Sequence, residues 1–361
     1  MPTAESTTDQ VRSLEEFDLP NNAGKAYGGM FEFPNEEEGN CYEMRTFKSH
    51  FIRIPEKKAN DNDQSLENSV LQHIHKEWKL NDPEFIIEVT GTANIKEINE
   101  ACVRYNNYEL KDKLKKSLID IALKRKAWIV TGGTDRGVMK YFGDEIARRR
   151  AMGIDIDALG FATWDVISQR EKLVKGEKAK LEAENTSEPL AVPLNNGYKY
   201  FILCDSGMDV ETEGVKAFGK EVVFRNNLMQ MISQRQDFNK QEGSSTENKG
   251  IPLVNISIGG GENTRKTLEH CLHWDEKKPP TDQKNQNDQN KQNDQNKQNI
   301  NNMTPIILIE GFGRVTDQLA EEFHNLGAQE EGSGNDSLVG LGKKSGMVCF
   351  PLTFKFFLIV T

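Results

Sequence analysis

Short apolar segments alternate with helical segments through the middle of the chain, and this alternation constrains the fold more than any other feature. The apolar segments are PEFIIEVTG, AWIVTGG, DALGFATW, YKYFILCD, IPLVNISIGG and TPIILIEG. Between them lie amphipathic stretches such as KDKLKKSLIDIALKRK, which places Leu114, Leu118 and Ile121 on one helical face. Strands that are apolar on both faces need helices on both sides. The sequence therefore predicts an α/β, Rossmann-like, doubly wound domain with a mostly parallel sheet covered on both faces.

This rhythm runs from residue 49 to residue 330, which we take as one domain. Residues 1–48 are polar and are expected to form a flexible N-terminal segment with at most short strands. Residues 281–302 repeat NDQNKQ in tandem and contain no apolar residue before Ile300, so a solvated loop insertion is favoured over an assembly element. Residues 331–361 form a C-terminal tail whose apolar end fits a buried strand, a monotopic anchor or a truncated reading frame.

Charge and composition exclude several classes of protein. The chain has 46 basic and 56 acidic residues and a net charge of −10, which disfavours a nucleic-acid partner. No segment reaches the ~18–20 apolar residues of a membrane-spanning helix, and the first residues lack a signal-peptide pattern, so a cytoplasmic location is expected. His270, Cys271 and His273 form one cluster without a second ligand pair, so no metal is expected.

Three of the strands end in glycine turns that lead into helices. The residues of these turns that we expect to face a ligand are Thr131, Gly132, Gly133, Thr134, Gly137, Val138 and Met139 in the first, Gly260, Gly261, Asn263 and Thr264 in the second, and Gly311, Gly313 and Arg314 in the third. Glycine lets a ligand approach the backbone, and a helix N-terminus offers free N–H groups to an anion. None of the turns matches GxGxxG or GxxxxGK[ST]. A phosphate-bearing ligand is predicted, with ordinary βα geometry as the alternative.

In a doubly wound sheet such turns lie beyond the carboxyl ends of the strands, where ligands bind. The first turn is the strongest candidate, and the second is expected to face it across one pocket. Asp135 is expected to cap the helix that follows the first turn. Thr163, at the end of DALGFATW, is included among the residues expected to line the pocket.

An ordered series of segments resembles a known family. WIVTGGTDRGVMKYFGDEI, ALGFATWDVISQREKLV, FILCDSG, EVVFRNNL, IGGGENTRKTLEHCL and IEGFGRVTDQLAEEF are similar to the cytosolic N-terminal homology region of melastatin-type (TRPM) cation channels. The resemblance covers roughly residues 45–330. That region is the eukaryotic branch of the SLOG (LSDAT) nucleotide-sensor superfamily, which is Rossmann-like.

The resemblance implies a nucleotide ligand, ADP-ribose or another adenine nucleotide, and no cofactor. In one channel of the family, arginines contact ADP-ribose, and Arg225 and Arg314 occupy the matching positions. Phe218 stands where that channel has a tyrosine. For Arg225 the alternative is a helix-surface arginine without a ligand. The resemblance also implies a homotetramer on the cytosolic face of a membrane, if the chain is a fragment of a calcium-permeable channel, with membrane contact only through a channel portion absent from this chain.

The superfamily also contains bacterial phosphoribohydrolases, whose PGGxGTxxE motif supplies a catalytic glutamate. Here Asn263 replaces the last glycine of the motif and Thr267 replaces the glutamate. Threonine cannot act as a carboxylate acid or base, and Glu269 lies about 200° further round the helix. Glu262 precedes the helix and is therefore a weak candidate for the missing carboxylate. A non-enzymatic sensor is therefore expected, and a hydrolase of nucleoside monophosphates and a purely structural channel-assembly domain remain the alternatives.

Overall fold

The computed structural model describes residues 15–18, 25–33, 47–56, 64–104, 108–174, 179–181, 191–207, 217–234, 250–271, 304–309, 314–319, 321, 346–351 and 355–360. The strands are β1 (Glu15–Asp18), β2 (Lys25–Glu32), β3 (Lys48–Ile54), β4 (Ile86–Gly91), β5 (Trp128–Thr131), β6 (Ala158–Thr163), β7 (Ala179–Lys180), β8 (Tyr200–Cys204), β9 (Leu253–Ile258), β10 (Ile306–Ile309), β11 (Gly346–Pro351) and β12 (Lys355–Val360). The helices are α1 (Ser65–Lys76), α2 (Ile95–Arg104), α3 (Tyr108–Lys124), α4 (Gly137–Ala151), α5 (Arg170–Val174), α7 (Glu221–Ser233) and α8 (Glu262–Cys271).

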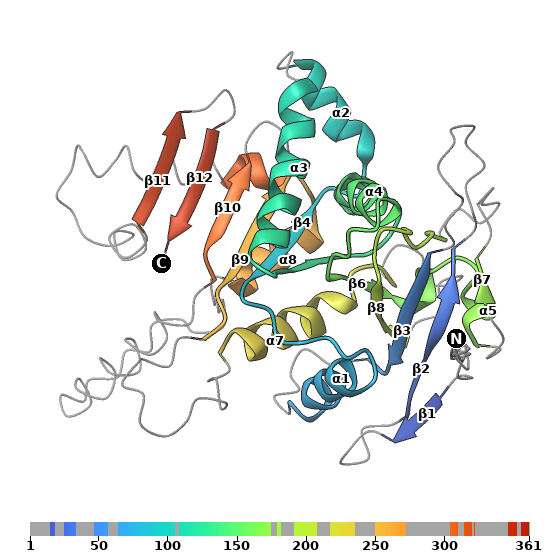
Figure 1. Ribbon diagram of the computed structural model, residues 1–361. Coiled ribbons are helices and arrows are strands. Elements are labelled where there is room, and N and C mark those ends of the chain that lie inside the picture. Colours follow the sequence, from blue (N-terminus) through green and yellow to red (C-terminus); the bar gives the residue numbers. More distant parts are fainter. Residues whose placement is uncertain are drawn as a thin grey trace, which may run out of the picture.

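These strands join in one sheet with the order β1-β2-β3-β8-β6-β5-β4-β9-β10-β12-β11, and β7 pairs with β2 (Figure 1). All neighbours from β3 to β10 along this order are parallel. The pairs at the two ends, β1-β2-β3 and β10-β12-β11, are antiparallel. The predicted α/β fold with a mostly parallel sheet is confirmed.

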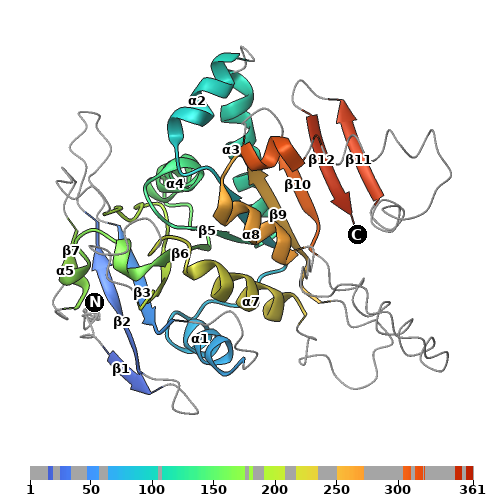
Figure 2. The same ribbon diagram turned by 180° about the vertical axis from the view of Figure 1, so that it is seen from behind.

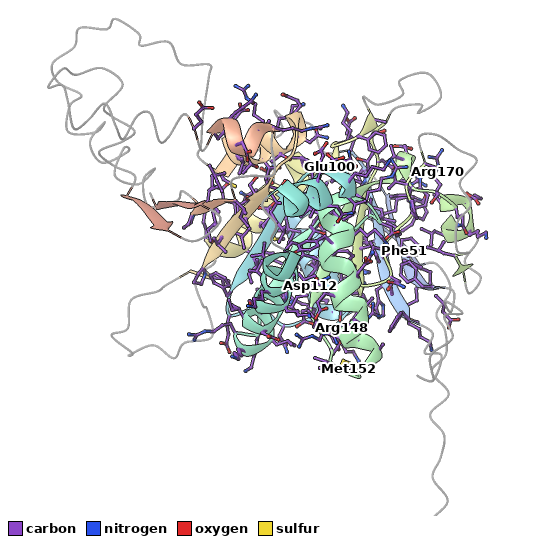
Figure 3. The ribbon with its side chains drawn as sticks, turned by 90° about the horizontal axis from the view of Figure 1, so that it is seen from above. Phe51, Glu100, Asp112, Arg148, Met152 and Arg170 are labelled. Atoms are coloured by element: carbon purple, nitrogen blue, oxygen red, sulfur yellow. The ribbon has the colours of Figure 1, made fainter. Side chains whose placement is uncertain are left out.

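Successive strand residues face opposite layers of helices. Ile87 and Val89 of β4 belong to the core under α3 and α4, whereas Ile86 belongs to the core under α1 and α7. Figures 1 and 2 show α2, α3 and α4 on one side of the sheet and α1 and α7 on the other. Seen from above in Figure 3, α3 and α4 lie side by side, with Asp112 on α3 and Arg148 on α4. Burial on both faces explains why the central strands are apolar throughout.

Both expected domain boundaries move outward. β2 pairs antiparallel with β3, with Gly28 opposite Ile52, and Phe31 and Phe33 are buried in the main core. Residues 25–33 therefore belong to the sheet and not to a flexible segment. At the other end β12 pairs with β10 and β11 pairs with β12, so strands of the region 331–361 also extend the sheet. The insertion at 281–302 lies outside the described residues.

The direction of winding reverses between β4 and β9. From β4 the chain adds β5, β6 and then β8 on one side, and it then returns to place β9 on the other side of β4, followed by β10. A reversal of this kind leaves a crevice at the carboxyl ends of the two strands, because their connections leave in opposite directions. The crevice lies above Gly91 and Ile258, which are paired in register.

Candidate functional site

A cleft of about 1040 Å³ opens at this reversal. Its lining comes from the loop after β4, the turn after β5, the end of β6, and the first residues of both α7 and α8. The volume is at the upper end of the range typical of small-molecule sites. The start of a helix carries a partial positive charge, so two helix N-termini at one cleft favour an anionic ligand.

The cleft gathers many of the residues that the sequence analysis expected. The predicted residues in its lining are Gly132, Thr134, Met139, Thr163, Phe218, Arg225, Gly261, Asn263, Thr264 and Arg314. Thr131, Gly133, Gly137, Val138 and Gly260 are not part of the lining. Gly311 and Gly313 lie outside the described residues. The first and second glycine turns thus face one cleft, but the deeper glycines of both turns support its wall.

The first turn uses its amides within the protein. The Gly133 N–H donates to Thr131 Oγ1 over 3.0 Å, and the Val138 N–H donates to the Thr92 carbonyl over 2.8 Å. Gly137 has a φ of +50°, and a Cβ there would lie 1.9 Å from that same carbonyl. The glycine is required by the close approach of α4 to the loop after β4. The N-terminus of α4 therefore braces this loop, and its Val138 amide has no capacity left for a ligand.

The expected helix cap at Asp135 is wrong. The N-cap of α4 is Arg136, and no side chain caps the helix there. Asp135 instead accepts hydrogen bonds from Lys140 Nζ at 2.9 Å and from Asn195 Nδ2 at 2.6 Å. The carboxylate is satisfied by this network because a cation and an amide reach it from α4 and from the 191–200 segment. Arg136 turns its guanidinium to the Ala191 carbonyl at 3.1 Å.

The floor of the cleft is the junction of β4 and β9. Gly91 has a φ of +155°, and a Cβ there would lie 2.2 Å from the Ile258 carbonyl. The Thr92 N–H donates to the same carbonyl over 2.9 Å, and Thr264 Oγ1 donates to the Gly91 carbonyl. Gly91 was not among the predicted site residues. The sequence does show a glycine at the end of IIEVTG, but only the strand order shows that this strand lies where the direction of winding reverses.

Arg225 is not the helix-surface arginine of the alternative interpretation. Its side chain is 4% exposed and forms an ion pair with Glu88, with 2.8 Å between Nε and Oε1. Its Nη2 donates to Thr267 Oγ1 over 3.0 Å. The threonine that replaces the hydrolase glutamate therefore holds the arginine at the inner end of the cleft, where both residues belong to the lining.

Glu88 was missed by the sequence analysis. It lies in the middle of β4 with 1% of its surface exposed, and the rest of IIEVTG is apolar or small. A charge in such a strand must be paired, because an isolated buried carboxylate is strongly unfavourable. That mismatch was the available signal for a functional residue. The partner, on a distant helix, could not be identified from local sequence.

Arg314 lies at the open side of the cleft and differs from Arg225 in exposure. Its side chain is 58% exposed, and its Nη2 lies 2.6 Å from Glu97 Oε1 on α2. Its φ is +60°, a conformation that non-glycine residues seldom adopt and that is often found at ligand sites. An exposed ion pair contributes little stability, so Arg314 can exchange this carboxylate for a ligand group at small cost.

Another part of the cleft lining is built around Thr163. Its Oγ1 donates to Glu221 Oε2 over 2.6 Å and accepts the Lys220 N–H over 3.2 Å. Lys220 Nζ lies 3.8 Å from Glu56 Oε1, and Phe218 adds an aromatic ring to the same wall. This wall offers a ring face, carboxylates and a hydroxyl, which together suit a nucleoside better than a phosphate.

The balance of charge along the cleft is positive although the chain is acidic. Among the described residues the lining carries five cations, Arg136, Lys220, Arg225, Lys266 and Arg314, and three carboxylates, Glu56, Glu221 and Glu262. None of the ion pairs among the described residues involves Arg136 or Lys266. Arg225 and Arg314 pair with Glu88 and Glu97, which lie outside the lining, so Arg136 and Lys266 contribute most to the attraction of an anion. The arrangement therefore suits a ligand with negative charge.

The described residues contain no group of three or more His, Cys, Asp or Glu side chains that could hold a metal ion. Burial raises the pKa of the Cys271 thiol well above its usual value. His273 of the HCLH cluster lies outside the described residues. Within the described part of the chain, no helix has the length and apolar character to cross a bilayer.

Comparison with known proteins identifies the family of this chain. The sequence model of the eukaryotic LSDAT family, described as SLOG in TRPM, matches residues 58–280. The chain belongs to this family. Similar proteins include the human transient receptor potential cation channel subfamily M member 7, 29% identical over 254 residues, and the mouse member 2, 28% identical over 263 residues.

A third relative is the subfamily M member-like 2 channel of Nematostella vectensis, 29% identical over 220 residues. The alignments cover 59% of this chain for the Nematostella protein and 70% for the human and mouse proteins. They cover only 11% to 14% of the relatives themselves. The chain thus corresponds to a SLOG region of melastatin channels.

Proposed function

We propose that the cleft binds a nucleotide with a diphosphate, ADP-ribose or a related adenine nucleotide, and that the domain acts as a non-enzymatic sensor. The observation that carries this proposal is the cation-rich cleft at the reversal between β4 and β9, where the winding of the sheet leaves room for a ligand. The resemblance of the site residues to a nucleotide-sensing family supports the same ligand class.

The phosphates fit best at the start of α8. Gly261, Asn263 and Thr264 surround the helix N-terminus there, and Lys266 and Arg314 also line the cleft. Helix N-termini bind phosphate through backbone N–H groups and the helix dipole, and arginine adds a planar pair of donors. The nucleoside then extends toward Phe218 and Thr163, where the ring can stack on the base and Glu221 can accept hydrogen bonds from ribose hydroxyls.

We further propose that the domain is a regulatory module of, or derived from, a melastatin-like calcium-permeable cation channel. The support is family membership and the names of the relatives, which are cation channels. In such a channel the domain would lie on the cytosolic face of the membrane and would be present in each subunit of a homotetramer. Occupation of the cleft would bias the channel only if the ligand binds one channel state more tightly than the other.

One observation favours a second candidate, a hydrolase of nucleoside monophosphates. Glu88 brings a carboxylate against Arg225, beside the Thr267 that replaces the catalytic glutamate. We prefer the sensor because Glu88 is not part of the cleft lining and because its charge is engaged by the arginine. A general acid or base must reach the reacting atom.

Isothermal titration of the purified chain with ADP-ribose, ADP and AMP tests the binding proposal, and release of free adenine from AMP tests the hydrolase. We expect saturable binding of at least one diphosphate and no base release. Base release that is lost in Glu88→Gln would establish the enzyme. If no adenine nucleotide binds or raises the melting temperature, the purely structural assembly domain becomes the better explanation.

A further inference from the structure

We propose that Glu88 sets the phosphate affinity of the cleft by pairing with Arg225, so that a ligand phosphate must compete with a carboxylate of the protein itself. The inference rests on the proposed function, because it concerns the ligand of the same cleft. It adds a regulatory residue that does not line the cleft and that acts through an arginine that does.

The geometry of the pair supports exchange of the carboxylate. The side chains of Arg225 and Glu88 are 4% and 2% exposed, and Nε lies 2.8 Å from Oε1. The two atoms nevertheless make no well-aligned hydrogen bond with each other or with another described group. Charge rather than a directional bond therefore holds the pair together, because hydrogen bonds weaken steeply with poor alignment. A phosphate that meets the guanidinium in a bidentate way makes the stronger interaction.

The surroundings of the pair are polar and incompletely bonded. Asn255 lies directly opposite Glu88 on β9, and both of its side-chain amide atoms are buried without a hydrogen-bond partner. The Oδ1 atom of Asn226, next to Arg225 on α7, is in the same condition, and Asn226 also lines the cleft. Buried polar groups are usually satisfied. The inner end of the cleft is therefore a polar site and not part of the hydrophobic core.

Charge explains the effect on a ligand. In the ion pair the carboxylate cancels the charge of Arg225, so the inner end presents little net charge to an incoming anion. Arg225 still has N–H groups in excess of those used by Glu88 and Thr267, since a guanidinium carries five. Removal of the carboxylate leaves a buried cation without compensation, which is strongly unfavourable until another anion replaces it. A phosphate supplies that anion.

The test compares Glu88→Gln with the wild type by titration of ADP-ribose and, separately, inorganic pyrophosphate. We expect Glu88→Gln to lower the Kd of both probes at least tenfold. Arg225→Ala alone should raise the wild-type Kd more than threefold, because it removes the guanidinium and leaves the buried Glu88 carboxylate without a cation. The double variant Glu88→Gln/Arg225→Ala should lose the gain, since the gain acts through the arginine.

Glu269→Gln is the matched control, because it removes a carboxylate from α8 outside the cleft lining, where it pairs with Arg265. It should change the Kd less than threefold. An equal gain in Glu269→Gln and Glu88→Gln would overturn the proposal in favour of a general charge effect. If circular dichroism shows that Glu88→Gln does not fold, Glu88→Asp keeps the charge but shortens the reach, and it should give a smaller gain; an unchanged Kd in that variant also overturns the proposal.

The two probes separate this inference from the proposed function. If the wild type binds ADP-ribose and the Glu88 variants bind it no more tightly, the role of Glu88 is rejected and the sensor remains. If ADP-ribose binds to neither protein but Glu88→Gln gains pyrophosphate binding, the role of Glu88 is supported and the nucleotide is rejected. Absence of binding of both probes to every variant overturns both proposals.

Discussion

The turn after β5 and the turn after β9 look alike in sequence, since each leads from an apolar strand through glycines into a helix, but they differ in what their polar groups do. In the first turn, the Val138 N–H donates a hydrogen bond to the Thr92 carbonyl and the Gly133 N–H donates one to the Thr131 hydroxyl. Both turns contribute to the cleft lining, through Gly132 and Thr134 in the first and through Gly261 and Asn263 in the second. A glycine turn before a helix therefore does not by itself indicate a ligand site, because amides in it can be engaged by contacts within the protein.

The comparison is tested most severely by Gly137→Ala. The new Cβ would lie 1.9 Å from the Thr92 carbonyl, and the residue has a φ of +50°. We expect a loss of about 3 kcal/mol or more in the free energy of unfolding, because both strain and a backbone clash oppose the substitution. Urea denaturation measures it.

Gly261→Ala is the control in the other turn, since φ there is not positive and a new Cβ would come no closer than 4.0 Å, to Arg314 Nη1. It should leave the free energy of unfolding within about 0.5 kcal/mol of the wild type. Equal losses in the two variants would show that the two turns do not differ in structural role.

The second prediction concerns the body of α4, which braces the first turn. Arg148 and Arg149 bind the Glu145 carboxylate and lower its pKa from 4.5 to about 2, against the opposing effect of burial. The pKa is depressed on folding, so the stabilisation is complete above about pH 5 and is lost as the pH falls toward 2. Glu145→Gln should cost about 2 kcal/mol at pH 7 and much less at pH 2.5.

Denaturation across this pH range measures that difference. The matched variant on α8 is Glu269→Gln, which breaks an exposed pair with Arg265 and should cost about 0.5 kcal/mol or less. A Glu145→Gln penalty that stays constant from pH 7 to pH 2.5 would mean that the arginines do not hold the carboxylate.

The third prediction concerns Arg314, which follows the third turn and lies beside Gly261 of the second turn. Arg314→Ala should weaken ADP-ribose binding about 10- to 150-fold, since a charge-assisted hydrogen bond contributes roughly 1.5–3 kcal/mol. Arg314→Lys should restore only part of the affinity because the planar fork is lost. Calorimetry measures both. Arg265→Ala, on α8 but outside the cleft lining, should bind like the wild type, and a similar loss there would remove the special role of Arg314.

The smallest expected effect comes from Thr131→Val in the first turn. The Thr131 side chain is fully buried, and its hydroxyl accepts the Gly133 N–H. Loss of that acceptor should cost about 1–2 kcal/mol in the free energy of unfolding and leave the Kd for ADP-ribose unchanged. Chemical denaturation and titration of one preparation give both values. A changed Kd with unchanged stability would instead show that Thr131 contacts the ligand.

Local pattern was sufficient to predict much of this molecule. The central strands follow from continuous apolar runs between helical stretches, because both faces of a parallel sheet are covered. The glycines at 132, 133, 260 and 261 could be placed at strand ends for the same reason. β2 was harder to recognise, because glycines at 28 and 29 interrupt its apolar pattern and because its partner, β3, lies beyond the polar residues 34–46.

The identity of the liganding groups depended on distance in space. Arg225 and Arg314 look equivalent in sequence, as two arginines near helix starts, yet one is buried against Glu88 and the other is exposed beside Glu97. Glu88 stands out only as a charged residue in an otherwise apolar strand, and the nearby sequence does not indicate which cation pairs with it. The local sequence pattern is enough to specify strands and turns, because these form from residues that are close together in the chain. Charge compensation acts through space, so it was settled only when β4, α7 and α8 packed together.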